Sequence, residues 1–153
     1  MFDHERLDVY RLELRFVAWV AALIKEIRKT PDVTVREPLD HLDRASLSAL
    51  LNTAEGNGKR QRKIRGRFFD DARGSATECA ACLDAIVAKG ATNAERVREG
   101  KEMLRRIVEM LTRMVERYST TVREDEAPYG KRGMERGRAR RKDSRRRRTR
   151  ERE

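Results

Sequence analysis

The sequence is poor in aromatic residues and in proline. Aromatic residues make up 5% of the 153 positions, and only three prolines interrupt the chain, whereas charged residues make up 41%. This composition is typical of long helices with charged surfaces and disfavours a sheet. The length is sufficient for one domain with a hydrophobic core. We therefore predict an all-α protein with one compact domain.

Cysteine and histidine are also scarce, with two residues of each. Cys79 and Cys82 stand in the sequence CAAC, but a zinc site needs about four ligands, and His4 and His41 have no matching spacing. No βαβ pattern surrounds the cysteines, as it would in thioredoxin-like proteins. We predict that both are small core residues, and we expect no metal or other cofactor.

Long apolar runs are missing. The longest, from Phe16 to Ile24, is too short to cross a bilayer. Acidic residues precede it, where a signal peptide would carry positive charge. We therefore expect a cytoplasmic protein that does not contact a membrane.

Groups of residues typical of catalysis are missing as well. Glu55, Asp70 and Asp71 are carboxylates near arginines, but no histidine or serine arrangement, phosphate-binding loop or set of metal ligands accompanies them. We expect that the protein is not an enzyme.

Apolar residues recur at helical spacing in four segments. Asp3 is a candidate N-cap for the first segment, and Pro38 suits the first helical position of the second, which Gly56 and Gly58 are expected to stop. Short connections favour an antiparallel up-and-down four-helix bundle, which we place in residues 1–122. The predicted helices are residues 3–29, 38–58, 61–89 and 92–118.

The third and fourth segments have the three-and-four spacing of a bundle seam. Gly74 lies inside the third at a cost of about 1 kcal/mol relative to alanine, which is most easily understood if another helix approaches closely there. Thr92 and Glu95 match a capping box at the start of the fourth. The predicted core residues of these segments are Phe68, Ala72, Ser75, Cys79, Cys82, Ile86, Leu104, Ile107, Leu111 and Tyr118, together with the methionines Met103, Met110 and Met114.

The first segment is apolar on two nearly opposite sides. A helix of this kind must be covered on both sides, so one side is expected to face the core and the other a second subunit. The first stripe is Leu7, Tyr10, Leu14, Val17, Ala21 and Ile24. We assign the oligomer interface to residues of the second stripe: Leu12, Phe16, Trp19 and Leu23.

Positive charge is concentrated in two regions. Residues 123–153 contain 14 Lys and Arg against 7 Asp and Glu, and residues 59–67 contain six basic residues and no acid. Because the whole chain carries a net charge of +11, the remainder is slightly negative. This localisation favours a polyanionic partner.

The basic residues at positions 59–67 follow a glycine turn. A solvated turn explains Lys59 and Arg60, because they lie near the C-terminal end of a helix, which favours cations. The other four fall in the first turns of the next helix, where the helix dipole disfavours cations and the charges repel one another. We therefore favour a ridge that binds phosphates, formed by Lys59, Arg60, Arg62, Lys63, Arg65 and Arg67.

The C-terminal segment, residues 123–153, has almost no apolar residues and is predicted to be disordered. Its arginine-rich part resembles arms that fold or condense on nucleic acid, and the alternative is a solubilising tail. The candidate contacts in it are Arg140, Arg141, Arg145, Arg146, Arg147 and Arg148.

The stretch HLDRASLSALLNTAEGNGK, followed by RFFDDARGSATECAACLDAI, resembles the central signature of the 23S rRNA intervening-sequence proteins. Thr53 stands where aliphatic residues are usual in that family, and the arginine-rich tail is not part of its pattern. The resemblance implies a four-helix bundle that assembles into a homopentamer and is presumed to bind RNA. A related branch, the accessory proteins of diversity-generating retroelements, binds nucleic acid and a reverse transcriptase.

Two functions remain open from the sequence. One is an oligomeric bundle that binds nucleic acid, RNA in preference to DNA, through phosphate contacts, because no base-reading motif is present. The other is a scaffold that docks a reverse transcriptase or another RNA-bound enzyme.

Overall fold

The computed structural model describes residues 1–125, and it describes side chains through residue 119 except that of Val33. The chain divides into the units Met1–Thr120 and Thr121–Glu153, and the description below concerns the first. Residues 1–125 contain helices and no strand. The elements are η1 (Asp3–Arg6), α1 (Asp8–Ile27), η2 (Val33–Val35), α2 (Arg36–Gly58), α3 (Arg62–Ala88) and α4 (Ala94–Asp125).

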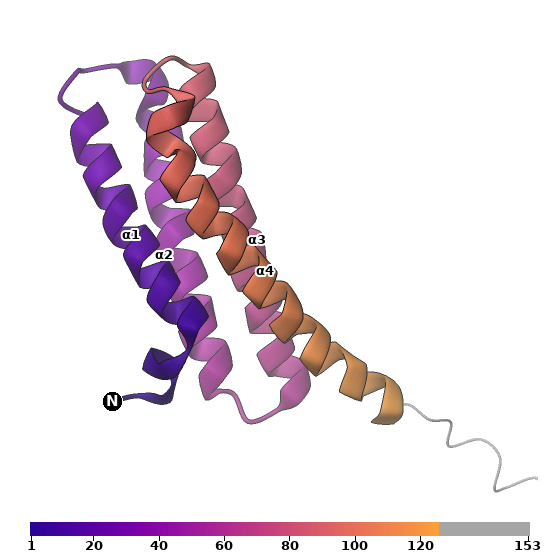
Figure 1. Cartoon of the computed structure of the whole chain (residues 1–153). Coiled ribbons are helices and arrows are strands. Elements are labelled where there is room, and N and C mark those ends of the chain that lie inside the picture. Colours follow the sequence, from indigo (N-terminus) through magenta and orange to yellow (C-terminus); the bar gives the residue numbers. More distant parts are fainter. Residues whose placement is uncertain (126–153) are drawn as a thin grey trace, which may run out of the picture. The chain divides into compact units, whose positions relative to one another are not determined.

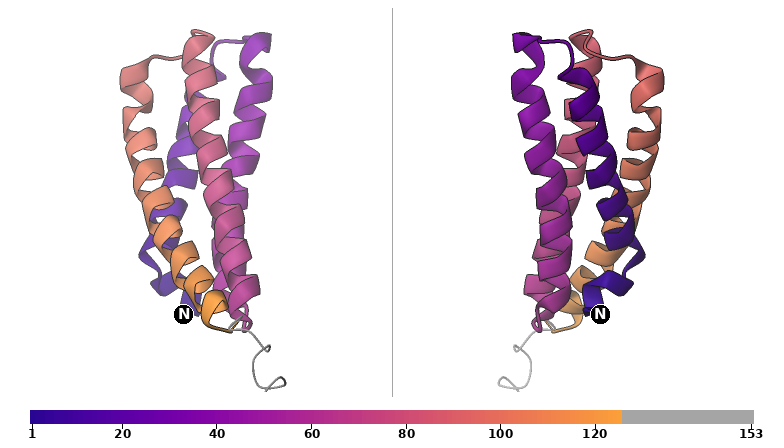
Figure 2. Two further views of the ribbon diagram at one scale, coloured as in Figure 1. Left: turned by 90° about the vertical axis from the view of Figure 1, so that its right-hand side faces the viewer. Right: turned by 90° about the vertical axis from the view of Figure 1, so that its left-hand side faces the viewer.

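The four long helices run alongside one another in alternating directions (Figures 1 and 2). Ion pairs join the neighbours: Arg28 of α1 lies 2.6 Å from Asp40 of α2, and Lys101 of α4 lies 2.5 Å from Asp84 of α3. The predicted all-α, antiparallel four-helix bundle is confirmed.

Aliphatic and aromatic side chains from all four helices fill the centre of the bundle. The largest fully buried ones include Phe16 and Leu23 of α1, Leu42 of α2, Phe69 of α3 and Leu111 of α4. At about 25 cal/mol per Å² of apolar surface removed from water, burial of such side chains is the main stabilising contribution.

Helices α2 and α3 pack closely because small residues face each other. Gly56 has no room for a side chain, since a Cβ atom there would lie 2.8 Å from the Cβ atom of Phe68. Ser48 and Ser75 form a hydrogen bond of 3.0 Å across the same pair of helices. Gly56 therefore serves helix packing, and of the two glycines predicted to stop α2 only Gly58 stands at its end.

Three predicted helix starts differ from the structure. Helix α2 begins at Arg36, two residues before Pro38. Leu7 has an extended backbone and separates η1 from α1, so Asp3 does not cap the long helix. At the start of α4, the side chain of Asn93 accepts a hydrogen bond of 2.9 Å from the amide of Arg96. Asn93 therefore caps α4 in place of the predicted box that begins at Thr92.

The buried stripe of α3 differs by one position from the predicted seam at several points. Phe69 is buried and Phe68 is only half-buried, because the stripe that faces the core is Phe69, Ala72, Ala76, Cys79, Leu83 and Ile86. A Cβ atom at Gly74 would meet nothing within 4 Å. The close approach predicted for the segment Gly74 to Ala76 therefore occurs at Ser75, which contacts Ser48 of α2, and not at Gly74 itself.

The cysteine and methionine predictions agree with the structure. Cys79 is fully buried and Cys82 packs against the edge of the core, and burial raises the pKa of the Cys79 thiol to about 12. Met103 is buried, and Met110 and Met114 are partly buried against the core. These sulfur-containing side chains fill space in the bundle.

The interface prediction for α1 is wrong. Leu12, Phe16 and Leu23 lie in the core of their own chain, with exposed fractions of 5%, 2% and 0%. Trp19 packs onto α4, where its ring occupies the space next to Gly100. A helix in a four-helix bundle touches two neighbours, and this wide buried surface accounts for the second apolar stripe without another subunit.

Candidate nucleic-acid interface

The basic cluster at positions 59–67 spans the end of α2, the connection, and the first turns of α3. The structure places all six basic residues at one end of the bundle, where Arg62 and Arg65 contact Tyr118 of α4. Their contacts differ, and these differences separate the residues that hold the turn together from those that remain available to a ligand.

Arg65 holds the turn together. Its guanidinium donates hydrogen bonds to the backbone oxygens of Lys59 (3.0 Å) and Asn57 (2.8 Å) and to the hydroxyl of Tyr118 (3.1 Å). It thus pairs carbonyl groups that the end of α2 leaves open. Because three of its five N–H donors are used inside the chain and the side chain is half-buried, we remove Arg65 from the predicted phosphate-binding set.

Lys59 and Arg62 are partly engaged. The ammonium of Lys59 lies 2.8 Å from a carboxylate oxygen of Glu55 and 4.8 Å from the centre of the Phe68 ring. The guanidinium of Arg62 lies over the Tyr118 ring at 4.9 Å and donates to a backbone oxygen of α4 at 3.3 Å. Both side chains are held on the surface, where they can still contribute to the local positive potential.

Arg60, Lys63 and Arg67 are exposed, and the part of the chain that the structure describes provides none of them with a hydrogen bond or an ion pair. We call them the exposed cations. Lys63 and Arg67 are one turn apart on α3 and share a face. The N-cap residue of α3, Gln61, makes no side-chain cap, so the first turn adds the positive end of the helix dipole to these charges.

This arrangement is unfavourable for the isolated bundle. Cations in the first turn of a helix are disfavoured by roughly 0.3–1 kcal/mol each, and no acidic residue occurs in the first turn of α3. An anion bound there would relieve the repulsion. The geometry therefore suits a phosphate group that contacts the exposed cations and the first turn of α3 together.

A second surface feature is apolar. Leu14, Leu47 and Leu51 are exposed by 51%, 48% and 56%, and we call them the leucine face. Leu47 and Leu51 are one turn apart on α2, and Leu14 follows Glu13, whose hydrogen bond to Thr53 of α2 places it beside this part of that helix. Leu14 and Leu51 thus lie at a similar level of two neighbouring helices, with Leu47 one turn farther along α2.

Sequence reasoning missed two parts of this picture. The pair Leu47 and Leu51 lies on the side of α2 away from the buried Leu42, and this spacing was a usable signal. The role of Tyr118 could not be found in the sequence, because residues more than fifty positions apart meet only in the folded bundle. The predicted contacts at positions 140, 141 and 145–148 lie outside the described residues.

Over residues 1–125, no group of three or more metal-ligating side chains comes together. No helix in that range has both the length and the apolar character needed to cross a membrane.

The fold and the turn define a class: an antiparallel four-helix bundle that presents a basic turn at one end. Residues 5–113 match the model of the family described as 23S rRNA-intervening sequence protein. The match covers more than half of the chain, and the chain therefore belongs to this family. A comparison with curated proteins finds no match. The matched range includes the exposed cations and the leucine face.

Proposed function

We propose that this protein is a non-enzymatic RNA-binding bundle that contacts backbone phosphates through Arg60, Lys63 and Arg67. The observation that carries the proposal is the lack of internal partners for these three cations, within the described residues, at the N-terminus of α3. The family name, which refers to 23S rRNA, supports RNA over DNA as the nucleic acid.

The mechanism is electrostatic. Each neutralised phosphate releases counterions, so log affinity falls with log salt by roughly 0.7–0.9 per neutralised phosphate. Arg65 and Tyr118 hold the turn in place, and the exposed cations reach the RNA from this rigid support. Because the turn presents no base-reading motif, discrimination between RNAs depends on their shape.

In this proposal the protein acts as a homo-oligomer. The leucine face forms the interface between subunits, in place of the α1 stripe that the sequence suggested. Exposed leucines on neighbouring helices are suited to packing against a second copy. The pentamer implied by the family resemblance would repeat the exposed cations around the assembly, so that one RNA could bind several subunits with increased avidity.

The test is RNA binding across a range of salt concentrations, measured with the full chain. The variant R60Q/K63Q/R67Q should lower the slope of log affinity against log salt by roughly 0.7–0.9 for each phosphate that is no longer neutralised. The matched control, K25Q/K29Q/R36Q, removes three exposed charges near the other end of the bundle. Equal slopes for the two variants would overturn the assignment, and duplex DNA of the same length tests the preference for RNA.

A second candidate function is a scaffold that docks a reverse transcriptase or another RNA-bound enzyme. The leucine face favours it, because such a surface also suits a different protein. If charged residues in place of Leu47 and Leu51 leave both self-association and RNA binding unchanged, a different protein partner becomes the better explanation of the leucine face.

A further inference from the structure

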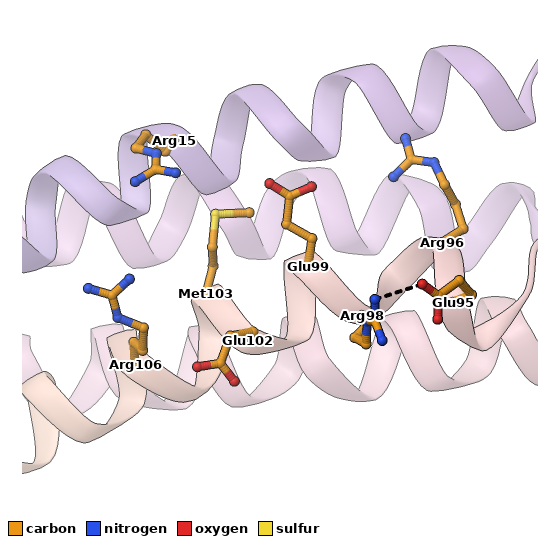
Figure 3. A pocket seen from close by; sticks show the side chains of 8 residues that line it. All are labelled: Arg15, Glu95, Arg96, Arg98, Glu99, Glu102, Met103 and Arg106. Carbon is orange, nitrogen blue, oxygen red and sulfur yellow. Dashed lines mark ion pairs between the residues drawn. The ribbon is translucent and has the colours of Figure 1, made fainter.

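A groove with a volume of about 770 Å³ lies between α1 and α4. Figure 3 shows Arg15 on α1 and Arg106 on α4 on opposite sides of the groove, with Met103 between them. Met103 has an exposed fraction of only 7%, so the floor of the groove at this point is apolar. A charged group that enters it is partly shielded from water, which strengthens its interactions with both arginines.

Most charges around this groove are already paired. Arg96 lies 2.8 Å from Glu26 of α1, and Arg98 lies 2.8 Å from Glu95. Glu102 accepts from Arg105 at 2.8 Å. These ion pairs leave three lining residues without a hydrogen bond or an ion pair in the described part of the chain: Arg15, Glu99 and Arg106.

The two remaining cations come from different helices and face the same space. Two guanidinium groups on opposite sides of a groove repel each other unless an anion lies between them. Their planar forks of N–H donors match the oxygens of a phosphate. Glu99 lies farther along the groove, and Glu102 lies on the Arg106 side, where its hydrogen bond to Arg105 and the charges of Arg105 and Arg106 lower its pKa. The favourable position for an anion is therefore between Arg15 and Arg106, away from both carboxylates (Figure 3).

The groove is connected to the turn by a row of arginines on α4. Arg106, Arg113 and Arg117 are spaced by seven and four residues, which keeps them on one side of the helix. Arg113 also forms an ion pair with Glu109 at 2.5 Å, which reduces its contribution to the positive potential of the row. The backbone oxygen of Arg117 accepts a hydrogen bond from Arg62 of the basic turn. At 1.5 Å per residue the row extends about 16 Å along the helix axis, a distance that a short stretch of nucleic-acid strand can follow.

We propose that the α1/α4 groove is a second phosphate site for the same RNA, in which Arg15 and Arg106 clasp one backbone phosphate. The inference rests on the proposed function. It extends that function from the end of the bundle to its side, so that an RNA strand runs from the exposed cations along α4 to the groove.

The experiment uses the full chain and a structured RNA. The variant R15Q/R106Q should lower the slope of log affinity against log salt by roughly 0.7–0.9, the amount expected when one phosphate is no longer neutralised. The control R36Q/R44Q makes the same change in net charge at two exposed positions of α2, a helix that does not line the groove. Circular dichroism should show the same helicity in both, since all four side chains are exposed. Equal slopes for the two variants would overturn the inference.

Glu99 provides a test of opposite sign. E99Q removes a negative charge beside the site and should tighten RNA binding at low salt by more than E37Q, which removes an exposed carboxylate at the start of α2. Inorganic phosphate as a competitor distinguishes a strand phosphate from a free anion. If millimolar phosphate displaces RNA from the groove while the turn stays bound, the groove binds free anions and the strand path is wrong.

The outcomes separate this inference from the proposed function. A reduced slope in R60Q/K63Q/R67Q with an unchanged slope in R15Q/R106Q would refute the groove and leave the turn in place. A reduced slope only in R15Q/R106Q would refute the turn as the RNA site. If the full chain does not bind RNA at all, both are wrong.

Discussion

The hydroxyl of Thr53 donates a hydrogen bond of 2.8 Å to a carboxylate oxygen of Glu13 and thereby joins α2 to α1 inside the core. Both residues are buried, with exposed fractions of 0% and 1%. The second oxygen of Glu13 has no partner in the described structure. Burial raises the pKa of Glu13 to about 8, while the Thr53 hydrogen bond opposes this rise. At neutral pH the carboxyl is therefore mainly protonated.

This pair predicts an unusual dependence of stability on pH. The pKa of Glu13 is higher in the folded state (about 8) than the ordinary value of 4.5, so the unfolded chain ionises first. Its contribution to stability is full below pH 4.5, falls as the pH rises toward 8, and then levels off. Between about pH 5 and pH 9 the decrease is roughly 4 kcal/mol, from 1.36 kcal/mol per pKa unit.

E13Q cannot ionise and should lose less stability over the same range. The measurement is urea unfolding of the parent and of E13Q at about pH 5 and pH 9, on either side of the interval between the two pKa values. Other titrating groups contribute to both proteins, so the difference between the two isolates Glu13. If the parent and the variant lose the same free energy of unfolding over this range, Glu13 does not titrate as described.

Replacing Gly100 and Gly74 by alanine should change the stability of the bundle in opposite directions. A Cβ atom at Gly100 would lie 2.3 Å from the ring of Trp19, so G100A should destabilise the bundle by about 1–3 kcal/mol through overpacking. At Gly74 nothing lies within 4 Å, and G74A should stabilise it by about 0.5–1 kcal/mol through helix propensity. Thermal unfolding of both variants measures whether each substitution lowers or raises stability. A stabilised G100A would contradict the packing described for α1 and α4.

Replacing Arg65 should lower the stability of the bundle, whereas replacing Lys63 should not. R65Q loses the hydrogen bonds to two backbone oxygens and to Tyr118, and we expect a decrease of about 1–3 kcal/mol in the free energy of unfolding. K63Q changes an exposed side chain and should stay within about 0.5 kcal/mol of the parent. Urea unfolding compares them. Equal stability of the two variants would mean that Arg65 does not hold the turn.

The leucine face should control self-association. L47E/L51E places charge at two exposed positions and should shift light scattering toward the monomer mass of 17.9 kDa, with helicity retained. By contrast, F16E places a charge in the core and should unfold the chain. A parent protein that is already a 17.9 kDa monomer, or a variant with unchanged mass, would rule out this face as the interface.

Much of the fold could be predicted from the sequence, because the spacing of apolar residues follows the helical period. All four long helices were placed, with errors of a few residues at most ends and a larger error at the end of α4, which extends to Asp125. The errors arise where several local patterns compete. Phe68 and Phe69 are adjacent and equally apolar, and the register of the buried stripe on α3, which includes Phe69, decides which of them is buried.

The candidate site was less predictable. The charge of the basic turn was evident, but which arginines hold the turn and which face solvent depends on Tyr118, a residue distant in the sequence. The partner of each face of α1 was also hard to predict from the sequence, because its two apolar stripes indicated a second subunit. Phe16 and Leu23 are buried, so the second stripe serves the bundle itself. Leu14 of the first stripe is exposed, and the exposed leucines were outside the assigned interface.

The most direct test of the central claim is lysine footprinting of the full chain with an amine-reactive reagent, with and without structured RNA at low salt. Lys63 is exposed among the proposed phosphate-binding residues, whereas Lys25 and Lys89 are exposed near the opposite end of the bundle. Bound RNA should slow the modification of Lys63 several-fold and leave the rates of Lys25 and Lys89 nearly unchanged. If Lys63 reacts at the same rate in the free protein and in a saturated RNA complex, the turn at the start of α3 is not the RNA-binding site.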